Sequence, residues 1–111
     1  MTNQEKLNDC KAFLGMFENT LDVGFQIAEK IDFEYCYAFH SGGGHTHLFL
    51  QLKDKNVVVI HFMEICIEVI DNSKNLSLSD FIDNEEEIWG YNEPIKLVDF
   101  IASEYFKTIQ K

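Results

Sequence analysis

The chain of 111 residues contains no arginine, and its nine basic residues are all lysines. Against them stand 19 acids, which give a formal charge of −10. Nucleic acids and anionic membrane surfaces attract proteins through a cationic footprint, so this balance argues against both as partners. It favours fast capture of cationic proteins, because electrostatic steering raises association rates by roughly 10- to 1000-fold at low salt.

Long apolar runs, close cysteine pairs and a signal-peptide core are also missing. No apolar run approaches the roughly 20 residues that cross a bilayer, and residues 1–6 are too polar to begin a secretory signal. The three cysteines, Cys10, Cys36 and Cys66, are widely spaced and form no CxxC pair. The simplest interpretation is a cytoplasmic protein with reduced thiols.

The composition that is present suits a folded protein. Hydrophobic residues make up 46% of the chain, ten of them phenylalanine, and charged residues make up 25%. A chain of this length and composition can bury a core, and disorder is not expected. Residues 1–111 are therefore expected to form a single domain.

The first third of the chain has a helical pattern. Thr2 and Glu5 have the spacing of a capping box. Apolar residues then recur at alternating steps of three and four, which predicts one helical stripe. The stripe could belong to one long helix or to two helices joined near residues 19–20. Its members are Leu7, Cys10, Leu14, Phe17, Leu21, Gly24, Ala28 and Ile31.

Residues 33–40 and 45–52 alternate in the manner of strands, and residues 57–70 form a longer run rich in β-formers. The turn-like stretches 41–44 and 53–56 separate them, which predicts a three-stranded antiparallel meander. In the favoured register Tyr37 lies opposite Leu48 and Leu50 opposite Val59, so that apolar residues share one face. The third run is long enough to bend or bulge.

The remaining elements are helical. Ser77 or Ser79 could cap a short helix, and Pro94 suits the first turn of a last helix. The prediction is an α+β fold with an N-terminal helix or two, the meander, a short helix and a C-terminal helix packed on the face of Tyr37 and Leu48. The stripe expected to be buried on the last helix is Val98, Ile101, Ala102, Tyr105, Phe106 and Ile109.

The favoured register gathers three histidines on the other sheet face. His40, His45 and His47 would lie there with Glu64 opposite His45. Imidazole nitrogens and a carboxylate are common zinc ligands, so a metal site is one hypothesis. The simpler interpretation is that these are surface histidines next to a glycine turn. His61 would fall on the core face, with its ring held by a hydrogen bond.

The same outer face is too apolar to be exposed to solvent over its whole area. Phe49, Ile60 and Phe62 are predicted on it, and contiguous exposed apolar area usually marks an interface. Either a helix of the chain covers this face or a partner does. A homodimer or a structural protein would use these three residues as its subunit contact.

Sequence motifs of catalysis are absent. Ser41 precedes three glycines, but the spacings GxGxxG, GxxxxGK and GxSxG do not occur. Cys36 and His40 share a strand face, yet their Cα atoms would be about 13 Å apart, too far for direct activation of the thiol. We therefore expect that the protein is not an enzyme.

The most distinctive segment spans residues 80–93. It holds six carboxylates, no basic residue and the only tryptophan of the chain, which Tyr91 follows closely. Tryptophan and tyrosine dominate binding hot spots. The alternatives are a solvated helix face and a tryptophan that anchors the segment to the core. The candidate partner-binding residues are Asp80, Asp83, Glu85, Glu86, Glu87, Trp89, Tyr91 and Glu93.

In its length, its acidic balance and the segment from Asp83 to Tyr91, the chain resembles the small acidic immunity proteins that bacteria make against nuclease toxins, including those of contact-dependent growth inhibition. The resemblance is general and includes no shared motif, so no residue role is transferred from it. It implies a cytoplasmic inhibitor that binds a basic toxin, such as a nuclease domain, without performing a reaction itself.

Overall fold

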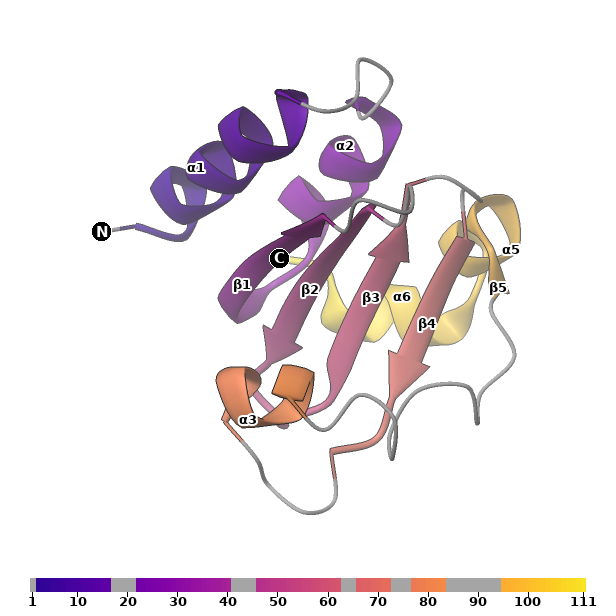
Figure 1. The fold of residues 1–111 in the computed structure, drawn as a ribbon. Helices are drawn as coiled ribbons and strands as arrows, with labels where there is room; N and C mark the ends of the chain where they lie inside the picture. Colours follow the sequence, from indigo (N-terminus) through magenta and orange to yellow (C-terminus); the bar gives the residue numbers. More distant parts are fainter. Residues whose placement is uncertain (1, 17–21, 41–45, 63–65, 73–76, 84–94) are drawn as a thin grey trace.

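The structure is a computed structural model that describes residues 2–16, 22–40, 46–62, 66–72, 77–83 and 95–111 (Figure 1). The predicted α+β class, with N-terminal helices, an antiparallel sheet and C-terminal helices, is confirmed. None of the helices in these ranges is long and apolar enough to cross a membrane. In chain order the elements are α1 (Asn3–Gly15), α2 (Asp22–Lys30), β1 (Phe33–His40), β2 (Thr46–Leu52), β3 (Val57–His61), β4 (Cys66–Ile70), α3 (Leu78–Asp83), β5 (Ile95–Lys96), α5 (Leu97–Ile101) and α6 (Glu104–Ile109).

The N-terminal stripe forms two helices, which settles the alternative that the sequence left open. Thr2 caps α1 as predicted, since its side-chain oxygen accepts a hydrogen bond from the Glu5 amide at 3.1 Å. Leu7 and Leu14 are buried from α1. Phe25 and Ala28 are buried from α2. The predicted stripe residues Phe17 and Leu21 lie outside the described residues.

The sheet has five antiparallel strands in the order β1-β2-β3-β4-β5. The predicted third strand over residues 57–70 is in fact two strands, because β4 folds back on β3 with Val57 opposite Ile70 and Ile60 opposite Ile67. Fourteen residues are more than a typical strand needs. Folding back gives the backbone of each half a neighbouring strand with which to hydrogen bond.

The predicted register is wrong by one residue in each of the first two hairpins. Tyr37 lies opposite Phe49 instead of Leu48, and Leu50 lies opposite Val58 instead of Val59. Because side chains alternate between faces, Leu48 and Leu50 no longer share a face with Tyr37 and Val59.

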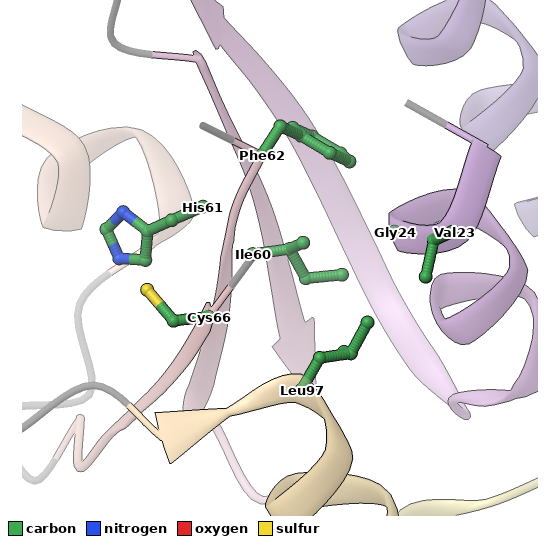
Figure 2. A pocket seen from close by; sticks show the side chains of 7 residues that line it. All are labelled: Val23, Gly24, Ile60, His61, Phe62, Cys66 and Leu97. Carbon is green, nitrogen blue, oxygen red and sulfur yellow. The ribbon is translucent and has the colours of Figure 1, made fainter. Parts of the chain in front are cut away.

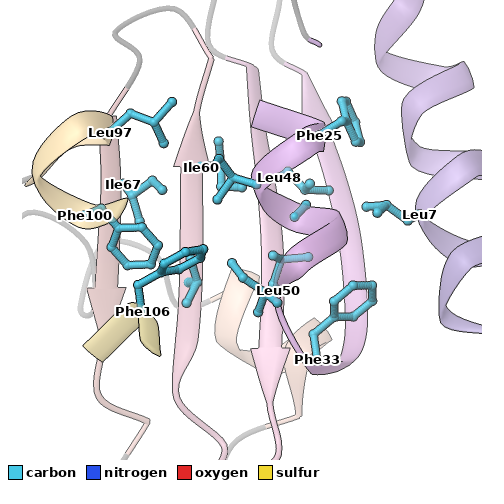
Figure 3. Close-up of a cluster of buried hydrophobic side chains, with 14 of the residues drawn as sticks. Leu7, Phe25, Phe33, Leu48, Leu50, Ile60, Ile67, Leu97, Phe100 and Phe106 are labelled. Carbon is cyan, nitrogen blue, oxygen red and sulfur yellow. The ribbon is translucent and has the colours of Figure 1, made fainter. Parts of the chain in front are cut away.

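Helices cover both faces of the sheet (Figure 1). On one face, α1, α2, α5 and α6 enclose the main core (Figure 3). On the other, Leu78 of α3 packs with Phe39 on a smaller cluster. We call these the four-helix face and the α3 face. The main core includes Leu7, Phe25, Phe33, Leu48, Leu50, Ile60, Ile67, Phe100 and Phe106. The smaller cluster consists of Phe49, Val57, Val59 and Ile70.

The C-terminal helix is divided in two, which changes its buried stripe. The first piece, α5, ends at Ile101, and Ser103 caps the second piece, α6, because its hydroxyl accepts a hydrogen bond from the Phe106 amide at 3.1 Å. The break turns Leu97 and Phe100 inward, whereas Val98 is 70% exposed. Of the predicted stripe, Phe106 is buried, Tyr105 and Ile109 are partly buried, and Val98, Ile101 and Ala102 are exposed.

Gly24 allows α2 to approach the end of β3. A Cβ atom at this position would overlap the ring of Phe62, which stacks on Phe25 with ring centroids 5.3 Å apart. We expect Gly24→Ala to destabilise the protein by about 1 kcal/mol. Overpacking against Phe62 should cost about 1–3 kcal/mol, whereas the higher helix propensity of alanine should recover only about 1 kcal/mol. Urea unfolding measures the change.

Gly15 supplies the matched control for this prediction. It also lies in a helix, but nothing stands within 4 Å of a Cβ added there. Gly15→Ala should therefore leave stability unchanged or raise it slightly. If Gly24→Ala were as stable as Gly15→Ala, the Phe62 ring would be free to move away and the close approach would not matter.

Candidate protein-binding surface

Two large aromatic side chains stand exposed on the α3 face. Tyr35 is 52% exposed and Tyr37 is 49% exposed. Both come from β1, which is an edge strand of the sheet. Their partners on β2, Gln51 and Phe49, are buried. The edge position therefore leaves two tyrosines half open to solvent beside a buried layer, an arrangement that suits contact with another protein.

The Tyr35 ring is also near a cation from another element. The Lys6 ammonium of α1 lies 5.1 Å from the centroid of this ring. A cation over an aromatic face is attracted by the ring quadrupole, which at an exposed site stabilises by about 0.5–1 kcal/mol. Lys6 thus restricts Tyr35 without covering it, so less side-chain freedom is lost when a partner binds.

The acidic segment begins next to these tyrosines. Helix α3 lies beside β1, and its N-terminus is held by a hydrogen bond from the Asp80 amide to the Ser77 hydroxyl at 3.2 Å, which supports the predicted serine cap. Asp80 is exposed in the first turn, where a carboxylate is favoured by the helix dipole. A negative charge and two open tyrosines therefore occupy one side of the molecule.

Polar side chains lie buried beneath this surface. His47 and His61 are opposite each other on β2 and β3, with ring centroids 4.4 Å apart. The Nε2 atom of His61 lies 3.2 Å from Oε1 of Glu68, and these side chains are 12% and 8% exposed. Phe39 stacks on His47 at 5.9 Å. His61 is thus largely buried, but it lies on the α3 face instead of the face of Leu48, and its neighbour there is Glu68.

A small pocket lies at the end of β3, between the starts of α2 and α5 (Figure 2). His61 and Cys66 point to one side of the sheet and Ile60 to the other. The cavity measures about 50 Å³ and most of its lining is apolar, whereas sites for small ligands usually occupy about 300–1,000 Å³. This pocket therefore has no room for a metabolite next to His61.

The predicted grouping of histidines is wrong where the structure describes it. His40 lies opposite Thr46, and His47 lies opposite the neighbouring Phe39, so the two rings project from opposite faces. His40 Nδ1 lies 3.0 Å from the Thr46 hydroxyl. His45 and Glu64 lie outside the described residues. Within the described ranges, no three His, Cys, Asp or Glu side chains are grouped to hold a metal ion.

The predicted secondary interface is also corrected. Phe49 is fully buried on the α3 face, while Ile60 is 3% exposed on the four-helix face. Phe62 is partly buried against Phe25. The one-residue register shift separates the first two, and helices of the same chain cover both. Phe49 and Ile60 thus cannot form a joint subunit contact, and the apolar area is covered from within the chain.

The predicted acidic site is described only at its beginning. Asp80 is exposed on α3. Asp83 ends this helix, and its side chain lies outside the description. Outside the described residues altogether are Glu85, Glu86, Glu87, Trp89, Tyr91 and Glu93.

Sequence reasoning missed Tyr35 and Tyr37, which it assigned to the core face. The pattern Tyr35-Cys36-Tyr37-Ala38 is apolar on both faces, so alternation alone does not tell which one is covered. One signal was available, because a tyrosine carries a hydroxyl that needs a partner when buried, whereas cysteine and alanine do not.

The comparisons with known proteins give no family for the chain. No family model, no curated protein and no solved structure matches it. The functional argument therefore depends on the surface itself.

Proposed function

We propose that the chain is a non-catalytic acidic inhibitor of the immunity type, which binds a basic protein toxin in the cytoplasm and neutralises it. The observation that carries this proposal is the exposure of Tyr35 and Tyr37 beside α3, the helix that opens the acidic segment, in a chain with a formal charge of −10. Aromatic anchors next to a predominantly negative surface suit a partner of positive charge.

Two groups of residues have separate roles in this proposal. The carboxylates of the acidic segment, with Glu85, Glu86 and Glu87 at its centre, attract the partner and pair with its lysine or arginine side chains. Tyr35 and Tyr37, together with Trp89, supply the buried contact. The partner is expected to be a nuclease-sized basic domain, because a surface that binds nucleic acid is cationic and an acidic inhibitor can cover it.

Capture of the partner is the first experiment. The tagged protein is used to pull down binders from a lysate of its native host, and the genes next to its own are inspected for a basic toxin domain. The expected result is a basic protein whose toxic activity disappears when this chain is added. A captured partner that is acidic, or a basic one that stays fully active in the complex, would contradict the proposal.

Neutralising the acidic segment should slow association with the captured toxin. The variant Asp83→Asn, Glu85→Gln, Glu86→Gln, Glu87→Gln removes four negative charges. Because steering contributes roughly 10- to 1000-fold to the association rate, we expect at least a tenfold slower rate at low ionic strength and a flatter dependence on salt. Stopped-flow fluorescence over a range of salt concentrations measures both quantities.

A charge-matched variant serves as the control. Asp9→Asn, Glu29→Gln, Asp99→Asn and Glu104→Gln also remove four charges, but from exposed positions on α1, α2, α5 and α6. This variant should lose much less of the association rate, because its charges lie on α1, α2, α5 and α6, which pack on the sheet face opposite to α3. Equal losses in both variants would show that net charge alone acts and that the segment has no special role.

A further inference from the structure

Cys10 and Cys36 are 26 residues apart in sequence, yet their Sγ atoms lie 3.7 Å from each other. Cys10 belongs to α1 and Cys36 to β1. Both are only partly buried, so small reagents can reach them. A disulfide needs its sulfurs about 2.05 Å apart, so the two atoms have to approach by about 1.7 Å.

Other contacts hold the two elements in place on either side of this pair. The Asn3 side-chain amide donates a hydrogen bond to the Phe33 carbonyl, near the start of both α1 and β1. Further along, the Ala38 amide donates to the Cys10 sulfur. Helix α1 therefore runs along the edge strand, and the two thiols meet where it does so.

The surroundings of the two thiols differ. The contact with the Cys36 sulfur lowers the pKa of the Cys10 thiol, and the hydrogen bond from the Ala38 amide acts in the same direction, while burial and the nearby Asp9 act in the opposite one. The contact with the Cys10 sulfur and burial raise the pKa of the Cys36 thiol. Because the Ala38 amide donates to the Cys10 sulfur and would stabilise a thiolate there, we assign Cys10 as the attacking thiol and Cys36, which stands next to it, as the resolving thiol.

We propose that Cys10 and Cys36 are a redox-active dithiol that a peroxide converts into a disulfide and that a thiol reductant restores. This site is independent of the proposed inhibitor function. The disulfide would join α1 covalently to the edge strand β1, whereas Tyr35 and Tyr37, the neighbours of Cys36 in sequence, lie on the opposite face of the sheet.

The reaction balances in two steps. The Cys10 thiolate attacks one peroxide oxygen, so that an S–O bond forms, the O–O bond breaks and hydroxide leaves, taking up a proton to become water. Cys36 then attacks the Cys10 sulfur as its own proton leaves, the S–S bond forms, the S–O bond breaks and a second water departs. The two thiols lose two electrons and two protons in total, and hydrogen peroxide is reduced to two molecules of water.

Cys66 provides an internal control. It is 7% exposed and lies opposite His61 on β4, which places it on the α3 face, while Cys10 and Cys36 pack against the core of the four-helix face. A reaction that depends on the geometry of the pair should leave Cys66 unchanged.

The test begins with the reduced wild-type chain treated with a small excess of hydrogen peroxide. Remaining thiols are then blocked with an alkylating reagent under denaturing conditions. We expect free thiols to fall from three to one per chain and the chain to lose two mass units before alkylation. Trypsin cleaves after lysine, so residues 7–11, 31–53 and 56–74 fall in separate peptides and the link can be assigned directly. Dithiothreitol should restore all three thiols.

Cysteine variants distinguish formation of the Cys10–Cys36 disulfide from unspecific oxidation of single cysteines. Cys66→Ser should form the same disulfide, whereas Cys10→Ser and Cys36→Ser should form none within the chain. The wild-type disulfide should also raise the melting temperature, an effect that dithiothreitol reverses. A linkage through Cys66, cross-links only between chains, or oxidation of single cysteines to sulfinic acid without a Cys10–Cys36 bond would overturn the proposal. These outcomes are read on the wild-type protein, so they do not depend on whether a variant folds.

Discussion

Phe49→Ala is expected to lower the free energy of unfolding by about 3–5 kcal/mol, the usual cost of removing a buried phenylalanine side chain. Phe49 is fully buried at the centre of the smaller cluster, with Val59 beside it on β3. Leu78 of α3 packs on this cluster. Truncation would leave a cavity between the sheet and α3 that neither element can fill without moving. Chemical unfolding monitored by circular dichroism measures the loss.

Tyr37 is the matched control because it lies directly opposite Phe49 on the neighbouring strand. Its side chain is 49% exposed, so Tyr37→Ala should cost about 1 kcal/mol or less of stability. Under the proposed function the same change should weaken toxin binding, since exposed tyrosines supply contact. The opposite pattern, with a stable Phe49→Ala and an unstable Tyr37→Ala, would support the register predicted from the sequence instead of the observed one.

Local features of the fold could be predicted from the sequence because short-range chemistry determines them. The cap at Thr2, both limits of β1 and the end of β2 follow from capping residues, alternation and turn-forming stretches. The register between the strands could not be predicted from these patterns. Residues Val57 to Ile60 are apolar at every position, so both faces of β3 are equally suited to burial. The sequence pattern therefore does not distinguish the observed register from one that is shifted by one residue.

The C-terminal helix was mispredicted for a similar reason. Both Leu97 with Phe100 and Val98 with Ile101 are pairs three residues apart, and either pair can form a buried stripe. Ser103 decides between them, because its hydroxyl accepts the capping hydrogen bond from the Phe106 amide, which starts a new helix and changes the direction of the buried face. Ser103, which lies within the predicted helical pattern, could have indicated a break in the helix, since serine is favoured at helix caps over helix interiors.

The candidate surface and the cysteine pair depend on tertiary contacts that a single sequence does not encode in any short pattern. Tyr35 and Tyr37 are exposed because β1 is an edge strand. Cys10 and Cys36 meet because α1 lies along that same edge. Covering an exposed edge with a helix is a common way to prevent unwanted strand pairing, and here it also brings the two thiols together.

Glu68→Ala is the second change with a large expected effect, about 3 kcal/mol of lost stability. Glu68 and His61 are both nearly buried and in contact at 3.2 Å. Removing one member of a buried polar pair leaves the other in a medium that solvates it poorly, which costs more than the pair itself contributes. Glu68→Gln keeps the shape and a polar end, so a loss of about 1 kcal/mol is expected. Urea unfolding of both variants measures these losses.

An exposed ion pair supplies the control for Glu68. Glu34 lies 3.5 Å from Lys55, with side chains 36% and 43% exposed. Because water screens this pair, Glu34→Ala should cost less than about 1 kcal/mol. The difference between the two alanine variants then isolates the effect of burial.

Replacing both His61 and Glu68 separates the cost of removing these two side chains from water from the favourable interaction between them. Glu68→Leu alone should be strongly destabilising, but together with His61→Phe it should recover most of the lost stability, since two apolar side chains of similar size leave no unsolvated polar group. Additive losses in the double variant would show that the two residues act independently. Recovery would mean that the polar pair is not required for stability, and that the α3 face could fold equally well over an apolar layer.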